Sequence, residues 1–267
     1  MLDPDEPGVR PLAGGTALML LTRSGLFDPR RLVSLRHVEG LTGIDDDGGR
    51  VVIGATTTLR SLERSPDVAG RFPALAQALA GLANVRVRNV ATVGGHLAHA
   101  DPHLDLPPVL MVLGASLLAV GPGGEREVRI EALITGYYET SLAPDELIAS
   151  VRIPVPGPGA RSSYVKFCAR SVEDWPAVGV AAAWRHEEAR LMDVRLAVGA
   201  IGARPTRLPE AEEVLSGRAP TAALLDEAAR AAAGAADPVP DENGSAGFKR
   251  EMVRVHVRRA LTPALDG

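Results

Sequence analysis

The sequence is poor in cysteine, in aromatic residues and in excess charge of either sign. Its 267 residues include one cysteine, Cys168, which excludes an internal disulfide. An iron–sulfur cluster needs several thiolates, so any such cluster must sit on a partner. The formal net charge of −4 provides no basic surface of the kind that binds nucleic acid. The longest apolar run, residues 106–120, contains prolines and Gly114 and is too short to span a bilayer.

The length suits one large domain or two or three small ones with ample core. Residues 1–7 are acidic and proline-rich and do not resemble a secretory signal peptide. We therefore expect a cytoplasmic protein.

The order of apolar segments predicts a mixed α/β region followed by an α+β region. The first region has strands expected at residues 9–12, 32–35, 51–55, 116–120, 127–130 and 146–153, and helices expected at 17–21, 56–65 and 72–82. Residues 154–159, PVPGPG, form the clearest linker. The second region has strands expected at 163–168, 177–184 and 191–201, then helices at 209–215, 221–233 and 246–261.

Residues 84–108 combine a glycine pair, three histidines, two aspartates and three prolines between apolar segments. Gly94 and Gly95 allow positive φ and let a bulky group approach the backbone closely. Successive backbone N–H groups in such a turn form an anion site that suits phosphate. Downstream, we expect Asp105 to cap a helix that begins with Pro107 and Pro108.

A second glycine pair, Gly14 and Gly15, also lies between apolar runs, and we expect Thr16 to cap the helix that follows it. One glycine pair usually only reverses the chain. Two such loops in one domain fit a ligand with two phosphates better than they fit two unrelated turns.

With these loops, the chain resembles the FAD-binding subunit of the molybdenum hydroxylases, which is the medium subunit of carbon monoxide dehydrogenase and xanthine dehydrogenase type enzymes. That family carries A-G-G-x-[ST] and, further on, R-N-x-A-T-[VI]-G-G-N followed by D-L-P-P. Residues 13–16, 88–95 and 105–108 match these motifs. Further matches are the Y-x-K of residues 164–166 and E-D-[FYW]-x-x-V-G-V-A at 173–181. The resemblance runs through nearly the whole chain, although only twelve residues precede Ala13, where the family usually has an extra strand and helix.

The resemblance implies an α+β fold. An FAD-binding domain like that of vanillyl-alcohol oxidase would cover residues 1–156, with α/β subdomains at about 1–56 and 57–156. A C-terminal domain at 160–267 would hold a three-stranded antiparallel sheet with helices. The implied cofactor is noncovalent FAD. The implied partners are a large molybdopterin subunit and a small [2Fe–2S] subunit in a hetero-oligomer.

The resemblance also implies the cofactor contacts. Phosphate oxygens would meet the two loops, formed by Ala13, Gly14, Gly15, Thr16 and Ala17 and by Thr92, Gly94, Gly95 and His96. Asp105 and Asp101 would hydrogen-bond FAD. Lys166 would lie near the flavin, where a cation stabilises the reduced ring, and Trp175 would cover the ring. His96 departs from the family, which most often has asparagine there; both residues offer a short side chain with a donor.

Several of these residues allow other interpretations. Histidines and carboxylates can bind zinc or iron. The candidate ligands here are His96, His99, Asp101, His103 and Asp105. Their spacing is not a known ligand spacing, so we expect no metal. Lys166 could be a solvated strand lysine, and Trp175 could belong to the core.

Two arginines of residues 84–108 each allow two roles. Arg86 and Arg88 could neutralise phosphate or form surface ion pairs, and the sequence favours neither.

Three functions are compatible with these residues. The first is an electron-transferring flavoprotein subunit that takes electrons from a partner's [2Fe–2S] cluster and passes them through FAD to NAD⁺, a quinone or another acceptor, with no catalytic acid or base of its own. The second is a stand-alone flavin oxidase or monooxygenase, for which the histidines of residues 96–103 would supply acid–base groups. The third is a non-flavin assembly module, against which the two glycine loops argue.

Overall fold

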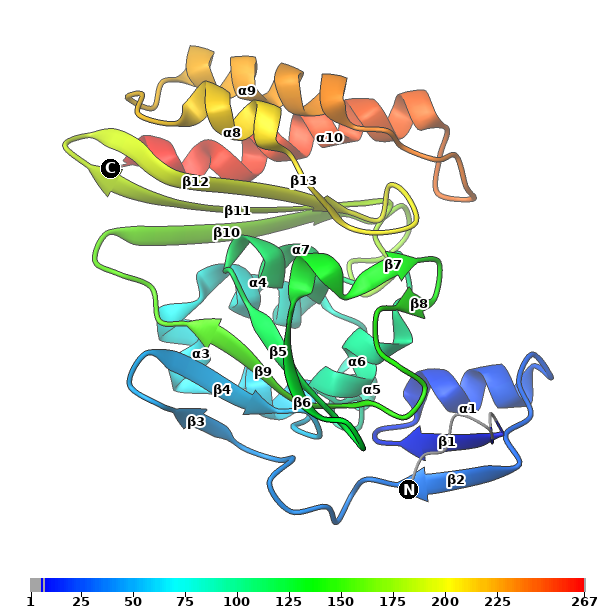
Figure 1. Ribbon diagram of the computed structural model, residues 1–267. Coiled ribbons are helices and arrows are strands. Elements are labelled where there is room, and N and C mark those ends of the chain that lie inside the picture. Colours follow the sequence, from blue (N-terminus) through cyan, green and yellow to red (C-terminus); the bar gives the residue numbers. More distant parts are fainter. Residues whose placement is uncertain (1–5, 7, 267) are drawn as a thin grey trace.

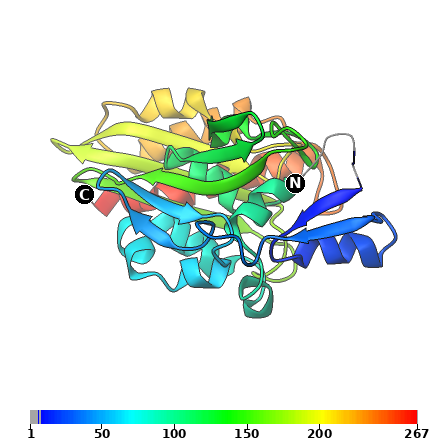
Figure 2. The same ribbon diagram turned by 60° about the horizontal axis from the view of Figure 1, so that its bottom comes forward.

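The computed structural model describes residue 6 and residues 8–266. The acidic segment 1–7 therefore lies, apart from Glu6, outside the described residues. The first unit is a β–α–β motif: strands β1 (Val9–Leu12) and β2 (Arg31–Ser34) pair in parallel, and helix α1 (Thr16–Arg23) connects them. This unit projects from one side of the molecule (Figures 1 and 2).

A five-stranded antiparallel sheet follows, in the order β3-β4-β9-β5-β6. Its strands are β3 (Ile44–Asp46), β4 (Arg50–Gly54), β5 (Ser116–Gly121), β6 (Gly124–Arg129) and β9 (Leu147–Pro154). The β3–β4 turn at residues 46–49 is built by aspartate side chains that accept backbone N–H groups. The sheet takes strands from both 1–56 and 57–156, so these two segments share one hydrogen-bonded layer.

Six short helices lie between β4 and β5 in the chain. They are α2 (Leu59–Glu63), α3 (Pro66–Arg71), α4 (Pro73–Gly81), α5 (Val85–Arg88), α6 (Val93–His99) and α7 (Leu106–Val112). Polar caps start several of them: the side chain of Thr58 accepts the N–H of Ser61, and that of Ser65 accepts the N–H of Val68. Their buried side chains form one core with the sheet, which includes Phe72. A small hairpin, β7 (Ile134–Gly136) and β8 (Glu139–Thr140), follows a single 3₁₀ turn (Ile130–Ala132).

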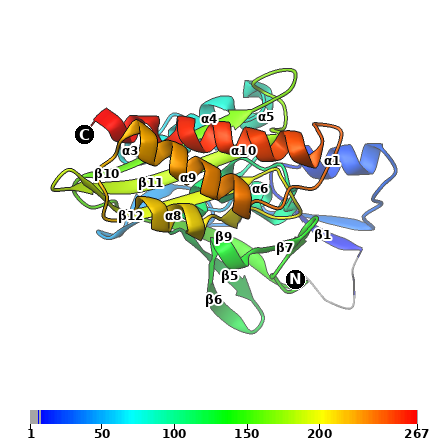
Figure 3. The same ribbon diagram turned by 90° about the horizontal axis from the view of Figure 1, so that it is seen from above.

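The C-terminal domain is a sheet in the order β10-β11-β12-β13. Its strands are β10 (Ala160–Phe167), β11 (Val178–Glu187), β12 (Arg190–Gly199) and β13 (Thr206–Arg207). Helices α8 (Pro209–Leu215), α9 (Ala222–Ala235) and α10 (Ala246–Leu261) cover one face (Figures 1 and 3), and a 3₁₀ segment (Thr262–Asp266) ends the described chain.

The two faces of this sheet belong to different cores. On β11, Ala181 packs into the core of the first domain, whereas its neighbours Val180 and Ala182 pack against the C-terminal helices. This is the period-2 alternation of a strand buried on both faces. Strand β10 packs against helix α4, and strands β11 and β12 pack against α7, so the C-terminal sheet is anchored to the first domain.

The predicted α+β fold is confirmed, with local differences. Strand β13 extends the expected three-stranded sheet to four strands, and helix α3 was not predicted. The helix-cap prediction for Thr16 is wrong, because the N-cap of α1 is Gly15. Asp105 stands at the predicted N-cap position of α7, but its side chain makes no capping bond. Among the described helices, none combines the length and apolar character needed to cross a membrane.

Candidate functional site

The two glycine loops, far apart in sequence, lie against each other. A Cβ atom on Gly14 would stand 2.2 Å from the carbonyl oxygen of Val90 and 2.9 Å from the Cα of Ala91. A Cβ on Gly95 would stand 3.8 Å from the Cβ of Ala13. The absence of a side chain at Gly14 is therefore what lets the loops meet, whereas a Cβ on Gly95 would make only an ordinary contact with Ala13. The structure brings the two predicted phosphate-binding segments into one place.

The first loop presents free donors. Gly15 has a left-handed backbone, with φ 77°, and turns the chain into helix α1. The backbone N–H groups of Gly14, Gly15, Thr16 and Ala17 make no hydrogen bond within the described residues. Because helix N-termini carry unpaired donors and a positive dipole end, this loop is suited to an anion.

The second loop differs, because its donors are already used. Val93 donates to the carbonyl of Thr57 at 3.0 Å, and Gly94 donates to that of Ala55 at 2.8 Å. Gly95 donates to the Oγ1 of Thr92 at 3.2 Å, so Thr92 caps helix α6. Gly94 and Gly95 lie inside the first turn of α6 and form no separate turn.

Gly94 has a packing role that the sequence pattern did not indicate. A Cβ there would stand 2.6 Å from the Cβ of Ala55, so Gly94 lets helix α6 approach the end of β4. Ala55 was not among the predicted site residues. The sequence feature that could have indicated Ala55 is a small residue directly after a buried strand.

A cluster of polar and aromatic side chains surrounds Asp101 after the C-terminus of α6. We call it the Asp101 cluster; its members are Asp101, His99, His103, Tyr138 and Trp175. The buried carboxylate of Asp101 accepts the Tyr138 hydroxyl at 3.0 Å and the backbone N–H of His103 at 2.8 Å. The His103 ring lies 6.4 Å from the Trp175 ring, and the His99 ring 5.3 Å from the Tyr138 ring.

The groups of this cluster shift one another's pKa values. Burial alone would raise the pKa of Asp101, but hydrogen bonds from His103 and Tyr138 outweigh it and hold that pKa below its ordinary value. Burial and then the Asp101 charge raise the pKa of Tyr138 to about 12, so the phenol stays protonated. Burial lowers the pKa of His99, which favours its neutral form.

Asp105, Tyr164 and Lys166 form a second, buried constellation at the boundary between the domains. The Tyr164 hydroxyl donates to Asp105 at 2.7 Å, and the Lys166 ammonium lies 3.1 Å from the same carboxylate. Lys166 also donates to the carbonyls of Gly81 and Asp174. Burial raises the pKa of Asp105 despite these partners. Lys166 is therefore not a solvated strand lysine but the buried counter-ion of Asp105.

Comparisons with known proteins match this architecture. The model of the FAD binding domain in molybdopterin dehydrogenase matches residues 2–156, and that of the CO dehydrogenase flavoprotein C-terminal domain matches residues 163–264. The chain belongs to the FAD-binding subunit family of the molybdenum hydroxylases. It is thus an oxidoreductase subunit with FAD as its cofactor, as the sequence motifs predicted.

Individual members of the family are similar over almost their whole length. The carbon monoxide dehydrogenase medium chain of Afipia carboxidovorans is 33% identical over 96% of this chain and 88% of its own. The nicotine 6-hydroxylase medium subunit of Paenarthrobacter nicotinovorans is 33% identical over 99% of this chain and 92% of its own. Among solved structures, quinoline 2-oxidoreductase from Pseudomonas putida 86 aligns with a TM-score of 0.92 at 30% identity, covering 98% of this chain and 91% of that one.

The site fits the cofactor of this family. The free donors of the first loop can receive phosphate oxygens. His96, beside Gly95, has an Nε2 atom that is buried without a hydrogen-bond partner. Burial, followed by the nearby His99, lowers the pKa of His96 to about 3, so its ring is neutral.

The remaining predicted residues lie beyond the loops. Trp175 is 59% exposed and is not part of the core. A hollow of about 430 Å³ opens beside Lys166, between α4, β10 and α10, and Val172 and Arg259 also line it. Trp175 and Lys166 belong to one segment of the C-terminal domain that faces the first domain.

Other charged groups serve structure. The side chain of Arg88 is buried, pairs with Glu63 at 2.8 Å and donates to the carbonyl of Leu82. Of the two roles left open for Arg88, the structure therefore shows the ion pair. Arg86 is exposed on α5. Of the histidines and aspartates that could have ligated a metal, Asp101, His103 and Asp105 bond to protein groups, and within residues 6 and 8–266 no group of three or more potential ligands converges.

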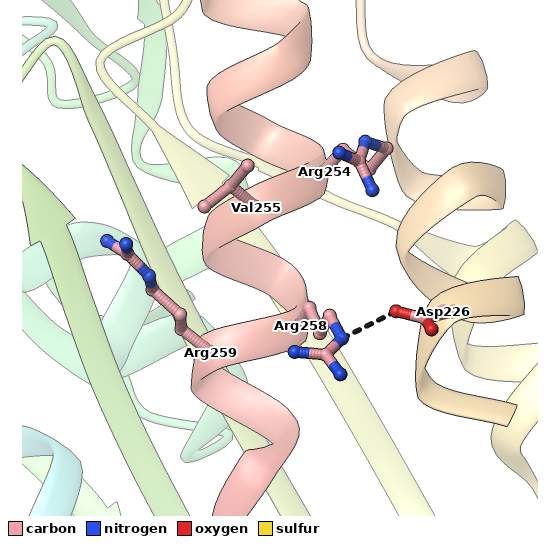
Figure 4. A pocket seen from close by; sticks show the side chains of 5 residues that line it. All are labelled: Asp226, Arg254, Val255, Arg258 and Arg259. Carbon is pink, nitrogen blue, oxygen red and sulfur yellow. Dashed lines mark hydrogen bonds and ion pairs between the residues drawn. The ribbon is translucent and has the colours of Figure 1, made fainter. Parts of the chain in front are cut away.

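A further hollow of about 410 Å³ lies between α9 and α10, far along the chain from both loops (Figure 4). It is lined by Asp226, Arg254, Val255, Arg258 and Arg259. The Arg258–Asp226 ion pair crosses it at 2.5 Å, and both side chains are well exposed.

Proposed function

We propose that this chain is the electron-transferring flavoprotein subunit of a molybdenum hydroxylase. In this function, electrons reach it from a partner's [2Fe–2S] cluster and leave to an acceptor such as NAD⁺ or a quinone. FAD supplies the redox chemistry when bound. The chain's own residues hold the cofactor, exclude water from part of it and set the charge around it.

The observation that carries this proposal is the pairing of the two loops. Free N–H groups of Gly14 to Ala17 lie next to the segment that begins helix α6. A pyrophosphate placed there would receive donors from the first loop and the dipole of α6 from the second. Ala13 and Thr92 border the same place, and His96 offers a neutral ring beside it.

Beyond the loops, the chain offers charged groups of both signs. The Lys166 ammonium supplies a fixed positive charge of the kind that stabilises electron-rich flavin, while Asp105 and Asp101 supply hydrogen-bond acceptors. Trp175, being exposed and at the edge of the Asp101 cluster, can lie over a flat ring. The members of these two constellations are engaged with one another, which suits cofactor positioning better than proton abstraction from a substrate.

Partners follow from the relatives. Two of them are named as a medium chain and a medium subunit, words that describe parts of larger assemblies. We extend this to the present chain: a large subunit would hold molybdopterin and oxidise the substrate, and a small subunit would hold the [2Fe–2S] cluster. The lone, unpaired Cys168 suits assembly in the reducing cytoplasm.

The decisive experiment is the visible spectrum of the purified chain before and after acid precipitation. A flavin spectrum with FAD released into the supernatant supports noncovalent binding and leads directly to co-purification with iron–sulfur and molybdopterin subunits. A chromophore that stays with the precipitate points to covalent attachment. A colourless chain that takes up no added FAD contradicts the proposal and favours an assembly module.

One observation favours a stand-alone oxidase as the second candidate. His99 is neutral and partly exposed, so it can accept a proton at the Asp101 cluster. In that case the purified chain would consume oxygen with a small substrate in the absence of any partner. Oxygen uptake that requires the other subunits decides against it.

A further inference from the structure

His103 joins the two domains through both nitrogens of its ring. Its Nδ1 lies 3.3 Å from an oxygen of Asp101, and its Nε2 lies 3.2 Å from an oxygen of Asp241. Asp101 belongs to the FAD-binding domain, whereas Asp241 lies in the loop that leads into α10. Asp241 in turn accepts the ammonium of Lys249 at 2.6 Å. A continuous chain of polar contacts therefore crosses the domain boundary beside the Asp101 cluster.

The protonation state of His103 decides whether this chain is complete. A neutral imidazole carries one N–H group, so it can donate to one carboxylate while its other nitrogen turns a lone pair toward the second. The imidazolium carries two N–H groups and donates to both. The hydrogen bond to Asp101, with Asp241 adding to it, raises the pKa of His103 in spite of burial.

The charges around His103 also favour its protonated form. Asp101 and Asp241 are both anionic, because the pKa of each is lowered. Lys249, only 1% exposed, supplies one positive charge. Tyr138 and His99, which face Asp101, are neutral, and Trp175 contributes an uncharged ring. With neutral His103 the group holds one excess negative charge, and with protonated His103 it is balanced.

We propose that His103, when protonated, is a positioning residue that fixes Asp101 and draws the C-terminal domain against the cofactor site. The inference rests on the proposed function, because it places Asp101 and Trp175 beside FAD. Protonation removes the excess negative charge, which would repel an anionic cofactor. Protonated His103 also holds Asp101 in one orientation and stands next to Trp175. FAD is then held more tightly at low pH than at high pH.

The test is the FAD dissociation constant of the full chain, measured by flavin fluorescence at about pH 6 and about pH 8.5, which bracket a histidine with a pKa above 6.5. The variants are His103→Gln, which cannot be protonated, and His37→Gln, which removes an exposed histidine elsewhere. We expect the constant of the native chain and of His37→Gln to rise about tenfold with pH, an ordinary size for coupling between two binding events. That of His103→Gln should stay nearly constant.

Two outcomes overturn the inference. The first is an equal pH dependence of FAD binding in the native chain and in His103→Gln. The second concerns a native chain that binds no FAD, a result that by itself defeats only the proposed function. In that case the unfolding free energies of the flavin-free native chain and of His103→Gln are compared across the same pH range. The stability of the native chain relative to the variant must fall as pH rises through the pKa of His103, and a constant difference disproves the role of His103 in joining the domains.

Discussion

Gly14 faces the carbonyl group of Val90 so closely that no side chain fits between them: a Cβ on Gly14 would stand 2.2 Å from that oxygen. The neighbouring Cα of Ala91 would be only 2.9 Å away. Both obstacles are backbone atoms, which cannot rotate aside as a flexible side chain could. The position of the first loop relative to helix α6 therefore depends on this one glycine.

Gly14→Ala should separate the loops and weaken FAD binding by tenfold or more. Overpacking of this kind costs about 1–3 kcal/mol, and the shift also displaces the free N–H groups of the first loop. Isothermal titration with FAD measures the loss. Gly70→Ala is the matched control, because Gly70 lies in helix α3 with nothing within 4 Å of an added Cβ. It should bind FAD normally and gain about 0.5–1 kcal/mol of stability. Equal FAD affinity in the two variants would contradict the prediction.

Asp105→Asn should destabilise the chain by about 3–5 kcal/mol, because it leaves the Lys166 ammonium buried without its counter-ion. Lys166→Met should have a similar effect for the opposite reason. The double variant should lose less than the sum of the two, since it leaves no unpaired charge. Urea unfolding measures all three.

The exposed Arg258–Asp226 pair (Figure 4) supplies the contrast to this buried pair. Arg258→Ala should cost about 1 kcal/mol or less, because solvent screens the pair. If the buried and exposed pairs give equal losses, burial of Lys166 and Asp105 is not what makes their pairing costly to break.

The parts of the fold that the sequence predicted are those specified by neighbouring residues. Apolar runs bounded by glycine and proline marked most strands and helices, and the two glycine loops, which lie together in the fold, marked the candidate site. Pro107 and Pro108 correctly indicated the start of α7. These sequence signals are local, so they predict the elements without knowledge of the tertiary structure.

What the sequence did not predict depends on distant residues. Asp105 was expected to cap its own helix, but Tyr164 and Lys166 approach it from another domain and engage the carboxylate instead. His103 meets Asp241 across 138 positions of sequence. Gly94 and Gly95 lie inside a helix because Ala55 and Thr57 accept the N–H groups that open it. No local pattern contains such partners.

His96→Asn should make the chain more resistant to acid. Burial lowers the pKa of His96 to about 3, whereas the unfolded chain has the ordinary value of 6.5. Stability is therefore fully present above pH 6.5 and is lost as pH falls toward 3, because the unfolded state takes up the proton first. At about pH 4.5 the native chain should be less stable than His96→Asn by about 1–3 kcal/mol, relative to their difference at neutral pH.

The comparison needs the full unfolding curve of each protein by circular dichroism between about pH 4 and about pH 8, the range in which an ordinary histidine titrates. FAD binding at neutral pH serves as the control, since asparagine keeps a donor at this position. Parallel stability curves would show that His96 is accessible to protons in the folded chain.

Trp175 should become protected when FAD binds. It is 59% exposed, whereas Trp184 is 3% exposed, so the two tryptophans of the chain are separable by their access to solvent. In Trp184→Phe, acrylamide should quench the emission of Trp175 strongly, and FAD should reduce that quenching because the flavin ring covers the indole. In Trp175→Phe, acrylamide should have little effect with or without FAD. Trp175→Ala should weaken FAD binding by about 0.5–1.5 kcal/mol, the worth of one aromatic pair. Unchanged acrylamide access to Trp175 in the FAD-bound chain would place the flavin ring elsewhere.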